Sequence, residues 1–219
     1  HVGRPGHEGS VERVLQAWGI DGHNSHTTVC SASARAGYQF TWGYDRPAPD
    51  HANAQLILLL SAHLESGHYF NPHAQRIIEA KHSGARIVVL DPRLSNTASR
   101  ADLWLPTKPG TEGAVILAAL KILIEEDRID RKFISEWVDW RGYLKELHPE
   151  DVPTVDLFLQ RFSEHLSEWT PAEAESYAGL ESGSIEKLAA EIARAAERAV
   201  ERDLWQSHGS PPVRAVADP

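Results

Sequence analysis

LILLL at residues 56–60 and RIVVL at residues 86–90 are the two apolar runs that decide the fold of this chain. Each run has the length of a strand, and continuous hydrophobicity over that length is typical of a strand buried on both faces of a parallel sheet. Between the runs, Asn71 is placed to cap a helix whose first position is Pro72, and Gly84 is placed to end it. The sequence therefore predicts a strand–helix–strand unit, which winds right-handed and places ligands at the carboxyl ends of its strands.

The chain beyond the second run continues this pattern. DLWLP at residues 102–106 is predicted to form a third short strand, and Thr111 to cap an apolar helix that runs to about Glu126. Because that helix is hydrophobic along nearly its whole length, we expect it to be buried between layers. The predicted fold class is α/β: a three-layer, doubly wound, mostly parallel sheet of Rossmann-like type with added helices.

The chain is predicted to divide into four segments. Residues 1–50 hold a short amphipathic helix at 8–18 and the only Cys. Residues 51–125 form the Rossmann-like subdomain, and residues 126–200 form a helical continuation. Residues 201–219 lack periodicity and are expected to be a disordered tail. Further helices are predicted at residues 129–140 and 184–199.

Composition limits the functions that this chain can have. Among 219 residues, 22 Lys plus Arg stand against 31 Asp plus Glu, and the absence of basic runs argues against nucleic-acid binding. One Cys can form neither an internal disulfide nor, alone, an iron–sulfur site. No apolar run reaches the roughly 20 residues of a membrane span, so we expect a soluble protein or a soluble part of one. The absence of Met, even at position 1, predicts a fragment or a processed chain.

The loops after the predicted strands carry candidate binding residues. Asp91 directly follows the second strand, where an acidic residue can accept hydrogen bonds from a nucleotide ribose; the alternative is a plain turn made by Asp91 and Pro92. The loop after the first strand, SAHLESG at residues 61–67, lacks the Gly-x-Gly-x-x-Gly pattern. It therefore gives little support to a nicotinamide dinucleotide site.

Pro109, Gly110, Thr111 and Glu112 precede and open the apolar helix. Backbone N–H groups there could bind an anion, and the Glu112 carboxylate could accept two N–H donors, as the N1 and N2 edge of guanine supplies. The alternative is an ordinary helix cap with an acidic residue in the first turn.

Histidines gather around the helix between the first two strands. They are His51, His63, His68, His73 and His82. Histidine is the commonest neutral metal ligand, so we consider a zinc or iron site. The five-residue spacing matches neither a helical face nor a zinc finger, and this argues against such a site.

Cys30 is the most distinctive single residue. It precedes SASARAGY, which could begin a helix, and a thiol at a helix N-terminus ionises readily and becomes a good ligand or nucleophile. The alternative is an inert, buried thiol. A Cys-His hydrolase using His26 or His23 is conceivable, but no residue is identified as an orienting partner.

Taken together, these segments resemble the DMSO reductase family of molybdopterin oxidoreductases, in its Cys-ligated type. Residues 88–123 are similar to the stretch through the first guanine-dinucleotide-binding subdomain, residues 58–85 to the nucleotide loop and helix before it, and residues 169–196 to a helical segment after it. The resemblance covers about residues 8–198. The matching residues are Asp91, Pro92, Arg93, Thr97, Ala98, Ala101, Asp102, Leu105, Pro106, Pro109, Gly110, Thr111 and Glu112.

The resemblance implies a set of nucleotide contacts at three loops. The first loop would contact phosphate or ribose, the second the nucleotide, and the third the guanine. These contacts would come from Ser61, Ala62, His63, Leu64 and Glu65, from Asp91, Pro92, Arg93 and Ser95, and from Gly110, Thr111 and Glu112. Where the family more usually has Gly-x-Asn, this chain has Ala62-His63-Leu64, which leaves backbone contacts but puts side-chain contacts in question.

By the same resemblance, Cys30 would be the protein ligand to molybdenum, through a soft thiolate. His26 would face the active-site funnel, with a solvated loop histidine as the alternative. Formate dehydrogenases of the family usually have His directly after the ligand, and Ser31 stands there instead. Other Cys-ligated members include periplasmic nitrate reductase and reductases of polysulfide, thiosulfate, tetrathionate and arsenate.

The resemblance further implies a molybdenum or tungsten bis(molybdopterin guanine dinucleotide) cofactor and two-electron oxygen- or sulfur-atom chemistry on a small substrate. A 4Fe-4S cluster is expected in the intact enzyme but not on this chain. Expected partners, in anaerobic respiration, are a membrane anchor, an iron–sulfur electron-transfer subunit, and the remainder of the catalytic subunit. A periplasmic location is favoured over a cytoplasmic one. The alternatives are a scaffold or electron-transfer subunit without the metal cofactor, and a stand-alone nucleotide-binding domain. As a middle fragment, the chain would hold half the cofactor and be inactive alone.

Overall fold

The computed structural model describes residues 5–20, 26–43, 49–62, 64, 71–201 and 215–218. The chain divides into two compact units, His1–Ala48 and Pro49–Pro219.

The first unit contains two helices. The helix α1 (Pro5–Ala17) confirms the prediction for residues 8–18. The helix α2 (His26–Trp42) begins four residues before Cys30. The prediction that Cys30 precedes a helix is therefore wrong: Cys30 lies inside α2, beyond the first four residues, whose N–H groups lack intrahelical partners.

The second unit is built on a parallel sheet of four strands in the order β3-β2-β1-β4. The strands are β1 (Leu56–Leu60), β2 (Arg86–Leu90), β3 (Leu103–Leu105) and β4 (Ala215–Asp218). The first three confirm the predicted strands, because residues buried on both faces leave a continuous apolar run. The prediction of a disordered tail is wrong at β4, whose backbone pairs with β1 from Leu56 to Leu59.

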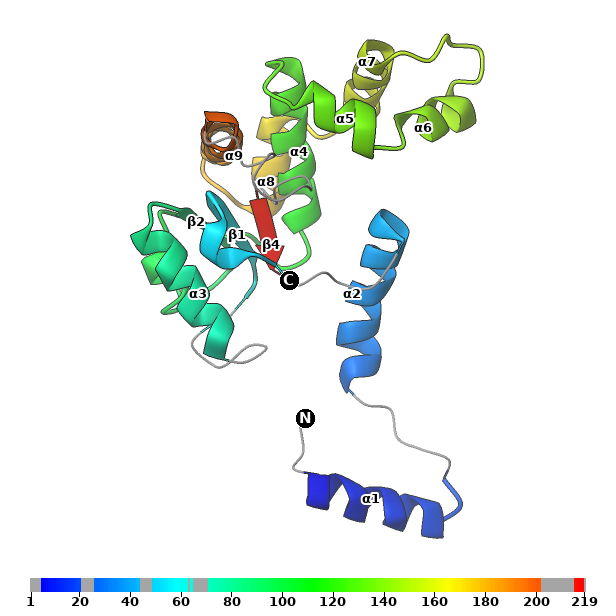
Figure 1. Ribbon diagram of the computed structural model, residues 1–219, viewed down its shortest axis with the longest axis vertical. Coiled ribbons are helices and arrows are strands. Elements are labelled where there is room, and N and C mark those ends of the chain that lie inside the picture. Colours follow the sequence, from blue (N-terminus) through cyan, green and yellow to red (C-terminus); the bar gives the residue numbers. More distant parts are fainter. Residues whose placement is uncertain are drawn as a thin grey trace. The chain divides into compact units, whose positions relative to one another are not determined.

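Helices cover both faces of this sheet, as the doubly wound prediction requires. On one face, α3 (Asn71–His82) packs Ile77 and Ala80 against alternate residues of β1 and β2. On the other face lie α4 (Glu112–Glu125), α8 (Pro171–Ala178) and α9 (Ser184–Glu201). Figure 1 shows α3 and this group of helices on opposite sides of the strands. The core therefore has two halves, separated by the sheet.

A small helical cluster extends the second unit. It consists of α5 (Arg131–Trp137), α6 (Trp140–Leu147) and α7 (Val155–His165), packed around Trp140 and Phe158. The helix predicted at 129–140 is present as α5 but ends at Trp137, and Asp139 caps a new helix by accepting a hydrogen bond from the Gly142 N–H. Short 3-10 turns occur at η1 (His51–Asn53) and η3 (Ala98–Arg100). Within the described ranges, no helix is long and apolar enough to cross a membrane.

Candidate functional site

The loops that leave the carboxyl ends of β1, β2 and β3 meet at one edge of the sheet, here called the carboxyl edge (the described residues 61, 62 and 64, 91–97 and 106–112). The first loop is tied to the second strand and the second loop. The Ser61 N–H donates to the Leu90 carbonyl (2.8 Å), and the Leu64 N–H donates to Thr97 Oγ1 (3.1 Å). Ser61 has a left-handed φ of 56°, and Ala62 is buried. His63 and Glu65 lie outside the described residues.

The loop after β2 is organised by Asp91. Its Oδ1 accepts a hydrogen bond from the Arg93 N–H (2.8 Å), and its carbonyl accepts one from Trp104 Nε1 (2.8 Å). The turn considered as the alternative role for Asp91 and Pro92 is therefore present. It uses one carboxylate oxygen only, and within the described part of the chain Oδ2 has no hydrogen-bond partner. Arg93 is exposed on the same loop.

Ser95 has a structural role in that loop. It is 3% exposed, and its Oγ accepts a hydrogen bond from the Ala98 N–H (3.1 Å) at the start of η3. Its carbonyl accepts a second bond from the Ser99 N–H (2.8 Å). The buried Ser95 hydroxyl therefore stabilises the loop. The contact of Ser95 with a nucleotide stays a prediction.

The loop before α4 presents an open helix terminus. Gly110 has φ 84°, a conformation that costs glycine little, and no atom lies within 4 Å of the place where a side chain would start. The Thr111 hydroxyl does not cap α4; it donates instead to the Lys108 carbonyl (2.6 Å), which corrects the prediction of a Thr111 side-chain cap. Among the described residues, the Glu112 carboxylate has no partner.

Sequence reasoning did not identify Lys108 as a functional residue. Its N–H donates to the Ala178 carbonyl at the C-terminal end of α8 (2.9 Å), and its side chain crosses Gly179. The available signal was a basic residue directly before Pro109 in a loop at the carboxyl edge.

Cys30 and His26 belong to the first unit, where they lie about one helical turn apart in α2. His26 is the first residue of that helix. The alternative interpretation of His26 as a loop histidine is therefore wrong, and its place in a substrate funnel stays a prediction.

The histidines considered for a metal are only partly brought together. The His51 and His73 rings make an edge contact with centroids 5.1 Å apart, and His82 is exposed at the end of α3. His63 and His68 lie outside the described residues. Another group, His148, Glu150 and Asp151, places ligand atoms within 4.8 Å of one another, but Arg161 Nε holds the Asp151 carboxylate at 2.8 Å.

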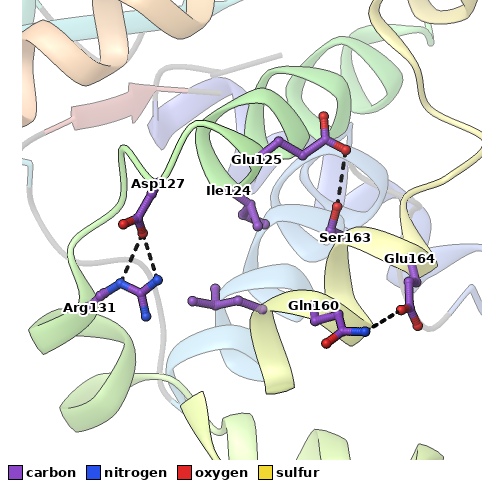
Figure 2. Close-up of a pocket in the computed structure, with 8 residues that line it drawn as sticks. Ile124, Glu125, Asp127, Arg131, Gln160, Ser163 and Glu164 are labelled. Carbon is purple, nitrogen blue, oxygen red and sulfur yellow. Dashed lines mark hydrogen bonds and ion pairs between the residues drawn. The ribbon is translucent and has the colours of Figure 1, made fainter. Parts of the chain in front are cut away.

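A shallow groove lies away from the carboxyl edge, where the end of α4 meets α7. It has a volume of about 310 Å³ and contains Ile124 and Leu159. Figure 2 shows that its polar groups are paired: Arg131 with Asp127, Ser163 with Glu125, and Gln160 with Glu164. Because these groups satisfy one another, the groove does not have the character of a polar binding site.

Comparison with known proteins identifies the family. A family model described as molybdopterin oxidoreductase matches residues 13–151, which include α2 and the three strands of the carboxyl edge. This chain belongs to the molybdopterin oxidoreductase family. The resemblance seen in the sequence is thereby confirmed, and the carboxyl edge belongs to a molybdopterin oxidoreductase domain.

Relatives within this family include oxidoreductases of bacteria. The chain is 28% identical over 183 residues to ArrA, the molybdopterin-containing subunit of the arsenate respiratory reductase of Chrysiogenes arsenatis. The alignment covers 78% of this chain and 21% of ArrA. It is 31% identical over 135 residues to "Probable oxidoreductase YoaE" of Bacillus subtilis, covering 58% of this chain and 19% of YoaE. The chain thus spans about a fifth of the length of these relatives.

A solved structure supports the fold. Acetylene hydratase from Pelobacter acetylenicus superposes with a TM-score of 0.61 at 23% sequence identity, covering 83% of this chain and 22% of that enzyme. This likeness confirms the α/β architecture.

Proposed function

We propose that this chain is part of the catalytic subunit of a molybdenum or tungsten oxidoreductase, and that its carboxyl edge binds one guanine dinucleotide of a bis(molybdopterin guanine dinucleotide) cofactor. The observation that carries the proposal is a pair of available acceptors at that edge. Asp91 Oδ2 and the Glu112 carboxylate have no hydrogen-bond partner among the described residues.

The donors and acceptors at the edge fit a guanine dinucleotide. A carboxylate such as that of Glu112 can accept both N–H donors of the guanine edge, and Asp91 can accept ribose hydroxyls. The first N–H groups of α4, which no side chain caps, suit a phosphate oxygen, and the Arg93 guanidinium on the neighbouring loop is exposed. No atom lies within 4 Å of the place where a side chain of Gly110 would start, so a ligand can approach the backbone before α4.

Cys30 fits the role of metal ligand by its chemistry, because a thiolate is a soft ligand suited to a metal already held by sulfur. His26, one turn earlier in α2, is proposed to face the substrate funnel. The bound cofactor would supply two-electron chemistry, in which oxygen or sulfur is removed from or added to a small inorganic or organic substrate. The residues of this chain hold and orient the cofactor.

The whole enzyme needs parts beyond this chain. The relatives are several times longer, and one of them is named as the alpha subunit of an F420-dependent formate dehydrogenase, which supports a multi-subunit assembly. We propose that the remainder of the catalytic subunit supplies the second dinucleotide site and a 4Fe-4S cluster. A membrane anchor and an iron–sulfur subunit would pass electrons in a periplasmic respiratory chain.

The nucleotide assignment is tested by cofactor content. Mild acid hydrolysis releases GMP from a guanine dinucleotide, so GMP per chain is measured in the full-length protein. Asp91→Ala and Glu112→Ala should each lower the GMP content several-fold, whereas Glu146→Ala, at an exposed carboxylate in α6, should not change it. Equal GMP in all variants would show that the carboxyl edge is not the nucleotide site. A wild-type protein without metal and GMP would favour the scaffold alternative.

The metal assignment has a separate test in the same protein. Cys30→Ala should abolish turnover and remove one sulfur neighbour from the X-ray absorption spectrum of the metal, with GMP content retained. Ser31→Ala, at the adjacent residue of α2, is the control and should leave the spectrum unchanged. An unaltered metal spectrum in Cys30→Ala would exclude Cys30 as the ligand.

A further inference from the structure

Lys108 is held in place by its main chain. Its N–H donates to the Ala178 carbonyl (2.9 Å), and its own carbonyl accepts hydrogen bonds from the Thr111 N–H (3.2 Å) and hydroxyl (2.6 Å). The first of these bonds links the β3–α4 loop to the C-terminal end of α8. The other two close the turn that leads into Glu112. The backbone of Lys108 is therefore fixed between the carboxyl edge and α8.

The side chain of Lys108 lies across a glycine. Gly179 has φ 72°, and a Cβ built on it would lie 2.8 Å from Lys108 Cε and 3.4 Å from Nζ. Contacts that short do not occur between real atoms, so only glycine at residue 179 leaves the lysine in this position. The clash falls on the end of a flexible side chain, which can move aside without disturbing the backbone.

The Lys108 ammonium is not needed to cap α8. The carbonyls of Glu175 and Ser176 accept hydrogen bonds from the Gly179 N–H, and the Ala178 carbonyl is occupied by the Lys108 N–H. Within the described part of the chain, Lys108 Nζ has neither a hydrogen bond nor an ion pair, and the residue is exposed. An exposed ammonium on a fixed backbone, without a protein partner among the described residues, is available for an anion from outside.

We propose that Lys108 binds the phosphates of the dinucleotide at the carboxyl edge and that Gly179, a positioning residue, keeps the ammonium in place. This inference rests on the proposed function, since the phosphates are the anionic part of the guanine dinucleotide. Phosphate oxygens are strong acceptors, and a lysine ammonium binds them as a compact charge. The α8 terminus, distant in sequence, thus contributes to the nucleotide site.

The test compares GDP with guanosine as probes of the cofactor-free, full-length protein. Lys108→Ala should weaken GDP binding by about tenfold, the loss expected for one charge-assisted hydrogen bond, and leave guanosine binding unchanged. Lys108→Arg should restore most of the affinity. If GDP and guanosine weaken equally, or if neither changes, Lys108 is not a phosphate ligand. Failure of the wild-type protein to bind GDP would instead overturn the proposed function itself.

Gly179→Ala tests the positioning role against a matched control. Gly183 has a similar φ of 83° but no atom within 4 Å of an added Cβ, so Gly183→Ala carries the backbone strain without the clash. Gly179→Ala should weaken GDP binding by about threefold, and Gly183→Ala should not. Adding Gly179→Ala to Lys108→Ala should cause no further loss, because the ammonium is already absent. A further loss in the double variant, or equal effects of the two glycine variants, would overturn the role of Gly179.

Discussion

Glu191 in α9 accepts two hydrogen bonds from the guanidinium of Arg86, the first residue of β2: Nη2–Oε1 is 2.7 Å and Nε–Oε2 is 3.0 Å. The Glu191 side chain is 9% exposed, and hydrogen bonding to it raises the pKa of Arg86 above the ordinary value for arginine. The pair joins α9 to the amino end of the sheet. At the opposite end, α8 binds Lys108. Hydrogen bonds therefore connect α9 to the amino end of the sheet and α8 to the loop that follows β3 at the carboxyl end.

Removing the charge of Glu191 should destabilise the protein. In Glu191→Gln, the bidentate pair is lost and Arg86 keeps a partly buried charge, so the free energy of unfolding should fall by about 1–2 kcal/mol. Urea unfolding measures the change. Glu197→Gln removes an exposed carboxylate paired with Arg128, and should cost less than about 0.5 kcal/mol. If Glu191→Gln and Glu197→Gln lower the free energy of unfolding equally, the Arg86–Glu191 pair contributes no more stability than a surface ion pair.

Glu175 should contribute to stability through α9. The residue is 5% exposed, and its Oε1 accepts a hydrogen bond from the Ile185 N–H (3.0 Å) in the first turn of α9. Glu175→Ala leaves that N–H without its acceptor and creates a cavity, which should cost about 2–3 kcal/mol. Glu175→Gln keeps an acceptor oxygen and should cost less than about 1 kcal/mol. Thermal unfolding of both variants checks this order, and a Gln variant as unstable as the Ala variant would contradict it.

Two helix glycines should respond to alanine with opposite signs. Gly113, in the first turn of α4, has no atom within 4 Å of an added Cβ, so Gly113→Ala should stabilise the protein by about 0.5–1 kcal/mol through helix propensity. At Gly142, an added Cβ would clash with the carboxylate of Asp139, whose Oδ1 caps α6 by accepting a hydrogen bond from the Gly142 N–H (2.9 Å). Gly142→Ala should therefore cost about 1–2 kcal/mol. Chemical unfolding of the two variants gives the signs directly, and a stabilised Gly142→Ala would refute the clash.

The ion pairs of Arg161 should make stability depend on acidic pH. A hydrogen bond from Arg161 lowers the pKa of the Asp151 carboxyl below its ordinary value, and hydrogen bonds from Gln160 and then Arg161 lower the pKa of the Glu164 carboxyl in the same way. Both carboxyl pKa values are lower in the folded protein than in the unfolded chain. The stabilisation is therefore fully present at pH values above the unfolded-state pKa values, and it is lost as the pH falls through the folded-state pKa values.

Arg161→Gln should accordingly be less stable than the wild type at neutral pH, and the difference should shrink by about pH 3. Urea unfolding at the two pH values measures it. Lys132→Gln removes an exposed cation that has no ion pair within the described residues, and its effect should not vary with pH. A difference for Arg161→Gln that is the same at both pH values would rule out these carboxylates as its source.

The sheet was predictable because burial on both faces leaves a local signal. The strands β1 and β2 end where their apolar runs end, and α4 carries the hydrophobicity of a helix between layers. The helices around Trp140 were less predictable. Short helices are ended and restarted by single capping side chains, as at Asp139, and their apolar pattern is only a turn or two long.

The candidate site was predictable only in outline. Parallel topology alone brings Asp91 and Glu112 to the same edge of the sheet, so both could be named from their positions after strands. The burial of Ser95 and the position of the Lys108 side chain across Gly179 could not be predicted from the sequence. Each depends on how a loop folds against residues that are not its sequence neighbours.

By itself, the sequence determined the strands β1, β2 and β3, the helix between the first two, and the family, because periodicity and motif order are local properties of the chain. Tertiary structure alone decided which polar groups meet: Arg86 with Glu191, Glu175 with the Ile185 N–H, and Lys108 with the end of α8. These contacts join segments far apart in sequence. Hydrogen bonds and ion pairs act over about 3 Å, so they exist only once the helices have packed on the sheet.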